Sequence, residues 1–197
     1  VLNNDQDETK PSPFTVEQSD YREEYLKNIT ESVRVIPISK LHDITSRLAK
    51  HPKVFLFAKG ISKHAAEYIN YLYTMAGFEV EYPRDHDFRQ LAVKQVKRDD
   101  IVFFLTYNGQ DGELLEMVKT LINTQNRPYL ISITEADNNT IQNLSDVNLY
   151  LFTDEVQVNG IEISSRISTI ALMELVLYQY IEDYGGRDFN FVKRHGH

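Results

Sequence analysis

Two short polar loops, each following an apolar segment, carry the residues best suited to hold an anion. The first reads Lys59-Gly60-Ile61-Ser62-Lys63. Gly60 permits a tight turn and close approach of a ligand, and Ser62 stands where a helix N-cap would, beside unpaired backbone N–H groups. A cation at Lys63 in a first helical turn opposes the helix dipole unless an anion compensates it. The alternative is that Ser62 only caps the helix while Lys63 points to water.

The second loop follows the apolar run 101–105 and reads Thr106-Tyr107-Asn108-Gly109-Gln110-Asp111. Its hydroxyl, amide and glycine groups would direct several hydrogen-bond donors into one crevice. The Asn-Gly pair alone is also ordinary turn chemistry. The position of both loops, directly after apolar strands, is what favours a binding site.

These loops require a parallel sheet to bring them together. After Pro52, short apolar segments alternate with amphipathic ones, a pattern that predicts an α/β fold with a doubly wound five-stranded parallel sheet. In such sheets ligands bind beyond the carboxyl ends of strands, where neighbouring connections leave in opposite directions. The expected strands are 54–58, 79–82, 101–106, 129–134 and 147–152, with helices at 62–76, 88–96, 111–124 and 140–144.

The flanking segments divide the chain further. We expect a polar tail or linker remnant over 1–18, a linker helix over 19–36, the α/β domain over 37–184 and a C-terminal tail over 185–197. A second helix is predicted at 38–50. The last helix, predicted at 162–183, is apolar almost all round and must be covered on every side. A second copy of the chain is the expected cover, and the N-terminal helices of the same chain are the alternative.

Composition excludes several classes of protein. The 197 residues are 42% hydrophobic, enough for a sizeable core, and contain no cysteine, which excludes disulfides, thiolate zinc sites and a cysteine nucleophile. The absence of a long apolar run or a signal-like start predicts a cytoplasmic chain with no membrane association. A net charge of −8 indicates that this stretch does not itself bind DNA. A first residue Val1 implies removal of Met or excision from a longer protein.

The motifs in these loops resemble those of a known family. The stretch 57–62, a helix ending at Met75-Ala76-Gly77-Phe78, and the second loop are similar to the sugar isomerase (SIS) domain, whose loops read G-x-G-x-S and S-x-S-G-x-[ST]. The resemblance implies a flavodoxin-like strand order and phosphosugar binding. The segment 163–167 resembles, more narrowly, the SIS domain of RpiR-type transcriptional regulators, and the likeness spans about 21–183.

The RpiR resemblance implies a division of labour along a longer protein. In that family a helix-turn-helix domain precedes a linker helix, so DNA would be bound only through an N-terminal domain absent from this chain. The implied partners are a phosphorylated sugar effector and a second copy of the chain, as a homodimer or a tetramer. The implied function is sugar-phosphate sensing by a regulator, without cofactors. A degenerate module that only dimerises remains an alternative.

Residue by residue, the match contains one serious departure. Gly60, Ser62 and Gly109 match the family motifs, Ala58 replaces the first glycine, and Thr106 and Asn108 stand for the two serines. Asp111 occupies the hydroxyl position that holds phosphate in the family. A carboxylate about 4 Å from a phosphate charge costs roughly 1 kcal/mol in water and about 4 kcal/mol at a dielectric near 20. The predicted ligand-binding residues are Gly60, Ser62, Lys63, Thr106, Asn108, Gly109 and Asp111, with Lys59, Tyr107, Gln110 and Glu155 as additional candidates.

Three interpretations of Asp111 follow. Lys59 and Lys63 supply the missing attraction while Asp111 caps its own helix or binds a sugar hydroxyl. Alternatively, Lys63 pairs with Asp111 and the pocket is degenerate. In the third, a neutral or amino sugar binds beside Asp111, Asn108 and Gln110.

The runner-up function is an aldose–ketose phosphate isomerase, which requires a general base. No acid or histidine stands in a specific enough context to be assigned as catalytic, and the acidic position of the family before the last helix falls on Gln157 or Glu155. His195 and His197 near the C-terminus predict no metal site. The candidate bases are His64, Glu67, His86, Glu135, Glu155 and Glu162.

Overall fold

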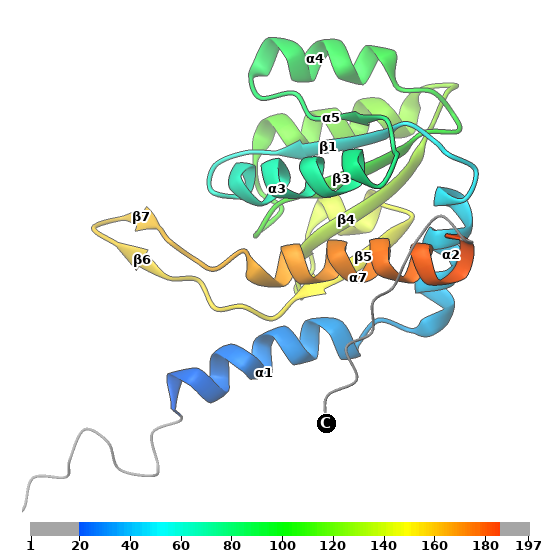
Figure 1. The fold of residues 1–197 in the computed structure, drawn as a ribbon. Helices are drawn as coiled ribbons and strands as arrows, with labels where there is room; N and C mark the ends of the chain where they lie inside the picture. Colours follow the sequence, from blue (N-terminus) through cyan, green and yellow to red (C-terminus); the bar gives the residue numbers. More distant parts are fainter. Residues whose placement is uncertain (1–19, 186–197) are drawn as a thin grey trace, which may run out of the picture.

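A five-stranded, all-parallel sheet forms the centre of the molecule (Figure 1). The computed structural model describes residues 20–185. The strands run in the order β2-β1-β3-β4-β5, the flavodoxin-like order that the resemblance implied. Every residue of β1 and of the central strand β3 is buried, as their apolar composition predicted. The strand bounds are β1 Val54–Ala58, β2 Val80–Glu81, β3 Ile101–Leu105, β4 Tyr129–Glu135 and β5 Val147–Leu151.

Helices cover both faces of this sheet. One face carries α2, α3 and α7, and the other carries α4, α5 and α6. The connections leaving β1 and β3 therefore pass over opposite faces, which confirms the doubly wound fold and creates a crevice between the ends of these two strands. The helix bounds are α1 Tyr21–Arg34, α2 Ile38–Leu48, α3 Ser62–Met75, α4 His86–Gln95, α5 Gly112–Asn123, α6 Thr140–Leu144 and α7 Ile167–Tyr184.

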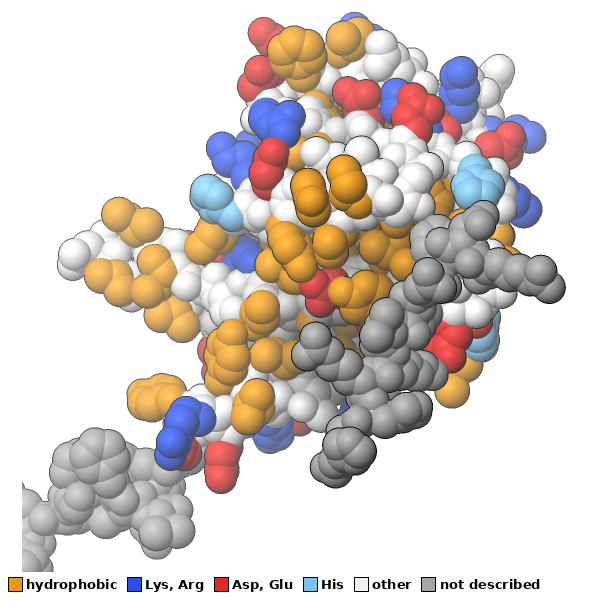
Figure 2. Space-filling model, viewed as in Figure 1, with side chains coloured by type: hydrophobic (Ala, Val, Ile, Leu, Met, Phe, Trp, Pro, Cys, Tyr) orange, Lys and Arg blue, Asp and Glu red, His pale blue; other side chains and the backbone are white. Residues whose placement is uncertain are grey.

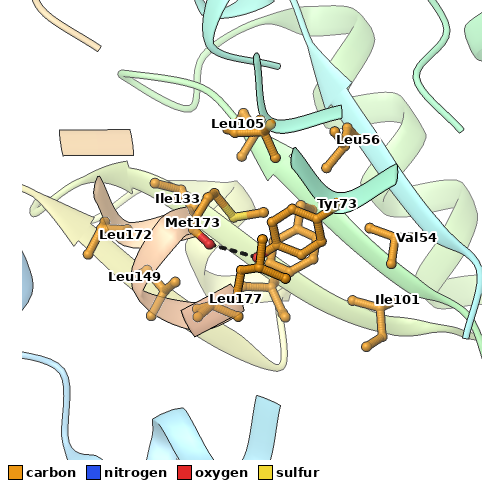
Figure 3. Packing of buried hydrophobic residues seen from close by; sticks show 14 of the residues in the cluster. Val54, Leu56, Tyr73, Ile101, Leu105, Ile133, Leu149, Leu172, Met173 and Leu177 are labelled. Atoms are coloured by element: carbon orange, nitrogen blue, oxygen red, sulfur yellow. Dashed lines mark hydrogen bonds between the residues drawn. The ribbon is translucent and has the colours of Figure 1, made fainter. Parts of the chain in front are cut away.

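The larger core lies between the sheet and α7 (Figure 3). Alternate side chains of β1 point to opposite faces, so Val54 and Leu56 enter this core while Phe55 and Phe57 enter the other. Tyr73 of α3 is fully buried, and its hydroxyl donates a hydrogen bond to the Met173 carbonyl oxygen at 2.8 Å. This bond satisfies a polar group that would be costly to bury alone.

The last helix is covered within the chain. Its neighbours are α1, α2, α3 and β5, and α2 and α1 make its most extensive contacts. The alternative in which N-terminal helices cover it is therefore the one observed. A second copy of the chain is not required to explain its apolar sequence. Tyr178 and Tyr184 are its large side chains that remain about half exposed.

A two-stranded hairpin, absent from the sequence prediction, precedes this helix and includes the predicted first residue of the helix, Glu162. Strands β6 (Gln157–Val158) and β7 (Ile161–Glu162) are antiparallel and project from the body of the fold (Figure 1). The turn residues Asn159 and Gly160 both have positive φ, 53° and 76°, the conformation that Asn-Gly favours in two-residue hairpin turns. Helix α7 begins at Ile167, five residues after the predicted start at Glu162, because Glu162 pairs with Gln157 in this hairpin.

The other differences are confined to the ends of elements. Helix α4 begins at His86, two residues earlier than predicted, because the Asp85 side chain accepts a hydrogen bond from the Phe88 N–H and caps it. Helix α1 packs against α7 and β5, and its role as a linker stays a prediction. The predicted tails, with His195 and His197, lie outside the described residues. No helix within 20–185 is long and apolar enough to cross a bilayer.

Candidate functional site

The loops after β1 and β3 enclose a small polar pocket of about 170 Å³ at the predicted crevice. It contains seven of the predicted ligand-binding residues and adds two polar residues that were not predicted to bind a ligand, Glu162 and Arg166. Lys63, Gly109, Gln110 and Glu155 do not line it. The lining residues are Lys59, Gly60, Ile61, Ser62, Thr106, Tyr107, Asn108, Asp111, Leu114, Glu162 and Arg166.

The first loop places Ser62 differently from the prediction. Gly60 has a φ of 59° and makes the turn, and Ile61 rather than Ser62 is the N-cap of α3. The Ser62 hydroxyl is buried and accepts a hydrogen bond from Arg166 Nε at 2.8 Å. Lys63 is exposed and does not line the pocket. The anion-binding potential of this loop therefore lies in Ser62 and its arginine partner.

The second loop is held in shape by its own polar groups. The Asn108 side-chain oxygen accepts a hydrogen bond from the Gln110 N–H at 3.0 Å. Asp111 is the N-cap of α5 and accepts a hydrogen bond from the Leu114 N–H at 3.0 Å, which confirms its predicted capping role. Gly109, with a φ of 66°, packs directly against the buried Asn139. The loop thus presents Thr106 and Asn108 to the pocket from a fixed frame.

Lys59, not Lys63, is the cation beside Asp111. Its Nζ lies 2.9 Å from Asp111 Oδ2 and 3.1 Å from Glu113 Oε2, so the alternative in which Lys63 pairs with Asp111 is wrong. The hydrogen bond to Asp111, chiefly, raises the pKa of Lys59. The negative charge that made Asp111 unfavourable for a phosphate is thus largely offset by a neighbouring ammonium group.

Glu113, the second carboxylate beside Lys59, is itself held by two further side chains. Arg89, whose side chain is 7% exposed, contacts both carboxylate oxygens, at 2.8 and 2.9 Å, and His86 Nδ1 lies 3.0 Å away. The Arg89 guanidinium is the main cause that lowers the pKa of Glu113 to about 2. Lys59 is therefore fixed between the Asp111 carboxylate and a Glu113 carboxylate that stays ionised at neutral pH.

Arg166 joins all parts of the site. Its side chain is 8% exposed and donates to Ser62, to Glu162 Oε1 at 2.7 Å and to the Ser164 carbonyl oxygen at 3.1 Å. Its guanidinium also lies 5.1 Å from the centre of the Tyr107 ring. Burial raises the pKa of Tyr107 to about 12, and the hydroxyl donates to the Thr153 carbonyl oxygen. One arginine thus links the first loop, the second loop and the hairpin.

The candidate general bases are dispersed. Glu162 is the one of the six that lines the pocket, and it is paired with Arg166. Glu67 pairs with Arg84 at the surface, His86 contacts Glu113, and His64 and Glu155 are exposed. Burial raises the pKa of the half-buried Glu135, which lies outside the pocket lining. Within residues 20–185 no group of three or more His, Asp or Glu side chains could hold a metal ion.

A parallel doubly wound sheet with a polar pocket at its switch point defines an α/β domain of the class whose ligand sites lie at that position. Residues 47–179 match the model of the SIS domain. The chain therefore belongs to the SIS domain family.

Similar proteins include regulators and phosphosugar isomerases. An uncharacterised HTH-type transcriptional regulator from Clostridium perfringens is 24% identical over 79% of this chain, which spans 55% of that relative, about half its length.

Three solved structures share the fold. Vibrio vulnificus NanR, complexed with ManNAc-6P, has a TM-score of 0.73 at 15% identity, over 85% of this chain and 64% of that one. The sugar isomerase domain of an RpiR transcription factor from Sphaerobacter thermophilus has a TM-score of 0.72 at 11% identity, over 84% and 90%. A phosphoheptose isomerase from Francisella tularensis has a TM-score of 0.59 at 19% identity, over 83% and 95%.

Proposed function

We propose that this chain is the sugar-phosphate-sensing domain of a cytoplasmic transcriptional regulator, and that a separate domain of the same protein binds DNA. The observation that carries the proposal is the convergence of Arg166 and Ser62 on one small polar pocket at the sheet's switch point. Membership of the SIS family and the likeness to regulator domains support it.

The pocket chemistry suits a monophosphate ester. A phosphate beside Ser62 would accept hydrogen bonds from the Ser62 hydroxyl and from the buried guanidinium of Arg166. The planar arrangement of the guanidinium donors matches the oxygens of a phosphate. Lys59 adds a second cation, and Asn108 and Asp111 can bind sugar hydroxyls. The phosphate must compete with Glu162 for Arg166 and with Asp111 for Lys59. Lys63, Gly109, Gln110 and Glu155 remain predicted contributors that would need to reach the ligand from outside this lining.

The state of the carboxylates favours a sensor over an isomerase. A general base must keep an available lone pair near the sugar carbons and a pKa close to working pH. The carboxylates lining the pocket, Asp111 and Glu162, are both engaged by cations. An isomerase would turn over an aldose or ketose phosphate, whereas we expect this chain to bind the sugar phosphate without turnover. NMR of the sugar anomers during prolonged incubation distinguishes the two.

Calorimetric titration with a panel of phosphosugars tests the site. We expect binding by the parent chain and by Asp111→Ser, and at least tenfold weaker binding by Arg166→Gln, because the phosphate loses a buried charge-assisted partner. Arg84→Gln is the matched control, since Arg84 forms a surface pair with Glu67 and should bind normally. An absence of heat with both the parent and Asp111→Ser would contradict phosphosugar binding.

Arg166 could also couple ligand binding to the arrangement of the subunits. If a bound phosphate draws Arg166 away from Glu162, the hairpin loses its link to the pocket and its equilibrium position changes. A sensor of this kind should alter operator affinity of the full-length regulator when the effector is added. Equal operator affinity with and without saturating effector would refute this coupling.

The partner that such a signal would reach is a second copy of the chain, in a homodimer or a tetramer. Figure 2 shows hydrophobic side chains gathered over α1, α3, α7 and the hairpin on one face. The most exposed large hydrophobic residues of α1, α3 and the hairpin include Tyr21, Leu26, Tyr71, Met75, Val158 and Ile161. Exposed apolar clusters of this kind are typical of protein interfaces.

A further inference from the structure

The hairpin that precedes α7 exposes one entirely apolar face. Val158 of β6 pairs with Ile161 of β7, and the Ile163 N–H donates to the Val156 carbonyl oxygen at 2.8 Å. Residues two apart along a strand point to the same side, so these four β-branched side chains lie together on one face. They are 46 to 68% exposed, and we call them the hairpin patch. A two-stranded hairpin is only marginally stable alone, so a partner that covers this face would stabilise it.

The opposite face of the hairpin belongs to the pocket. Gln157 and Glu162 form the pair between the two apolar pairs, and strand alternation directs their side chains away from the hairpin patch. Glu162 lines the pocket and lies 2.7 Å from Arg166. The hairpin patch can therefore contact a partner while Glu162 stays in the pocket.

A second uncovered apolar surface lies at the N-terminal end of α1. The apolar stripe of this helix runs at steps of four residues through Tyr21, Tyr25, Ile29 and Val33. Val33 packs against the larger core, whereas Tyr21 and Tyr25 are 88% and 49% exposed. Leu26, which follows Tyr25, is 62% exposed. We call Tyr21, Tyr25 and Leu26 the α1 patch.

The two patches together have the size of a protein interface. At their exposed fractions, the seven side chains offer on the order of 600 Å² of mostly apolar surface. Homodimer interfaces are about 65% apolar, so this surface corresponds to roughly 900 Å² per partner. A standard stable complex buries about 800 Å² per partner, which the hairpin patch alone would not reach. A stable contact therefore requires a partner that covers both patches at once.

A second copy of the chain can cover both patches at once. The hairpin and the N-terminal end of α1 project on the same side of the molecule (Figure 1), so a two-fold rotation can set the hairpin of each copy against α1 of the other. Such a dimer is closed and covers both patches of both copies. Anionic lipids and nucleic acids are disfavoured, because the exposed acidic residues Asp154 and Glu155 lead into the hairpin.

We propose that the hairpin patch of each copy docks on the α1 patch of the other copy in a two-fold homodimer. The proposal rests on the homodimer of the proposed function and assigns its contact surface. Because Glu162 lies on the other face of the same hairpin, only the hairpin separates each pocket from α1 of the other copy. A ligand that displaces Glu162 would then act directly on the contact between the two copies.

Sedimentation velocity over a range of concentrations tests this contact with a matched pair of variants. Val158→Lys and Gln157→Lys place the same charge at adjacent positions, the first on the hairpin patch and the second on the opposite face. We expect Val158→Lys to weaken dimerisation at least tenfold, because a charge would be buried without a partner. Gln157→Lys should stay within threefold of the parent. Leu26→Glu on α1 should weaken dimerisation at least tenfold for the same reason.

Mixing the two weakened variants distinguishes this pairing from a contact between two hairpins. In a heterodimer of Val158→Lys and Leu26→Glu, one contact joins two unaltered patches and the other brings the new lysine to the new glutamate. We therefore expect the equimolar mixture to dimerise at least threefold more tightly than either variant alone. Circular dichroism of each variant should match the parent, because both altered side chains are exposed.

Three results would overturn the proposal. A parent chain that stays monomeric at every concentration would show that a different protein covers these patches. Dimerisation of Val158→Lys that equals that of Gln157→Lys would show that the hairpin patch is not in the interface. No recovery in the mixture would show that the hairpin does not meet α1 of the other copy. Calorimetry of the parent with phosphosugars measures the pocket separately, so failure of this contact is distinguishable from failure of the sugar site.

Discussion

At the residue scale, Glu113 is the ionisable group of the site whose charge contributes most to stability. The folded-state pKa near 2, against 4.5 for a free glutamate, means that ionised Glu113 stabilises the fold above about pH 4.5 and loses this effect as pH falls through about 2. Glu113→Gln should therefore lower the free energy of unfolding by about 2 to 3 kcal/mol at pH 7, since Arg89 is left buried without its partner.

Urea denaturation at two pH values measures this effect. The difference between parent and Glu113→Gln should fall to less than about half at pH 3. Glu116→Gln is the matched control, because Glu116 pairs with Lys119 at the surface and should change stability by less than about 0.5 kcal/mol. A pH-independent difference for Glu113→Gln would show that packing, not charge, is responsible.

Two glycines at the pocket should respond differently to the same substitution. Both need positive φ, so an added methyl group strains either backbone by roughly 1 kcal/mol. At Gly60 the new Cβ meets nothing within 4 Å, whereas at Gly109 it lies 2.5 Å from Asn139 Oδ1. Asn139 is buried and also bonded to Thr134 and to the Gln142 N–H, so it cannot move away.

We therefore expect Gly109→Ala to cost about 3 kcal/mol of unfolding free energy and Gly60→Ala only about 1 kcal/mol. Chemical denaturation of both variants gives the comparison directly. Equal losses would mean that Asn139 shifts without cost and that the second loop is less rigid than its contacts indicate.

At the element scale, the pattern of apolar residues located the strands and most of the helices. It did so because the apolar residues of each element recur at the spacing with which its side chains face the core. Strand β1 and helix α6 have the predicted bounds, and α3 differs by one residue. The hairpin was missed because each of its strands is two residues long, too short to show a period. The Asn159-Gly160 turn was the available signal.

The same limit applies to the site. Sequence motifs located both loops, since strand ends fix where loops meet. The motifs could not show whether Lys59 or Lys63 faces Asp111, because that depends on how the turn at Gly60 directs the two side chains. Arg166 reaches Ser62 across 104 positions in the chain, a contact that local patterns do not encode.

The hairpin itself should affect binding more than stability. Residues 154–161 are all exposed, so strain placed in its turn costs the core little. We expect Gly160→Val to lower the free energy of unfolding by about 1 kcal/mol, the strain of a side chain at positive φ, and to weaken phosphosugar binding severalfold, because the hairpin no longer holds Glu162 and Arg166 in place.

Gly77→Val provides the matched control for this hairpin variant. Gly77 also has a positive φ, 96°, with no atom within 4 Å of an added Cβ, but it connects α3 to the strand at the sheet edge. It should lower the unfolding free energy by about 1 to 2 kcal/mol and leave ligand affinity unchanged. Denaturation and calorimetry on both variants separate the two roles, and equal effects on affinity would contradict a specific role for the hairpin.

At the scale of the whole molecule, exposed apolar side chains occur on both faces of the sheet but gather on one. Tyr71 and Met75, 62% and 67% exposed, lie four residues apart on α3, on the same face as α7. Phe88 is 60% exposed on α4, which covers the opposite face. If the chain dimerises through the α3 face, Tyr71→Glu and Met75→Glu should each weaken self-association at least tenfold, because a charge would be buried without a partner.

Sedimentation velocity over a range of concentrations measures the monomer–dimer equilibrium of these variants. Phe88→Glu should sediment as the parent does, since an equally exposed apolar residue is replaced outside the proposed interface. Loss of the dimer in Phe88→Glu, with retention in Tyr71→Glu, would assign the interface to α4 and separate it from the hairpin. Effector binding could then not reach the partner through Arg166, because its hairpin contact and α4 lie at different parts of the molecule.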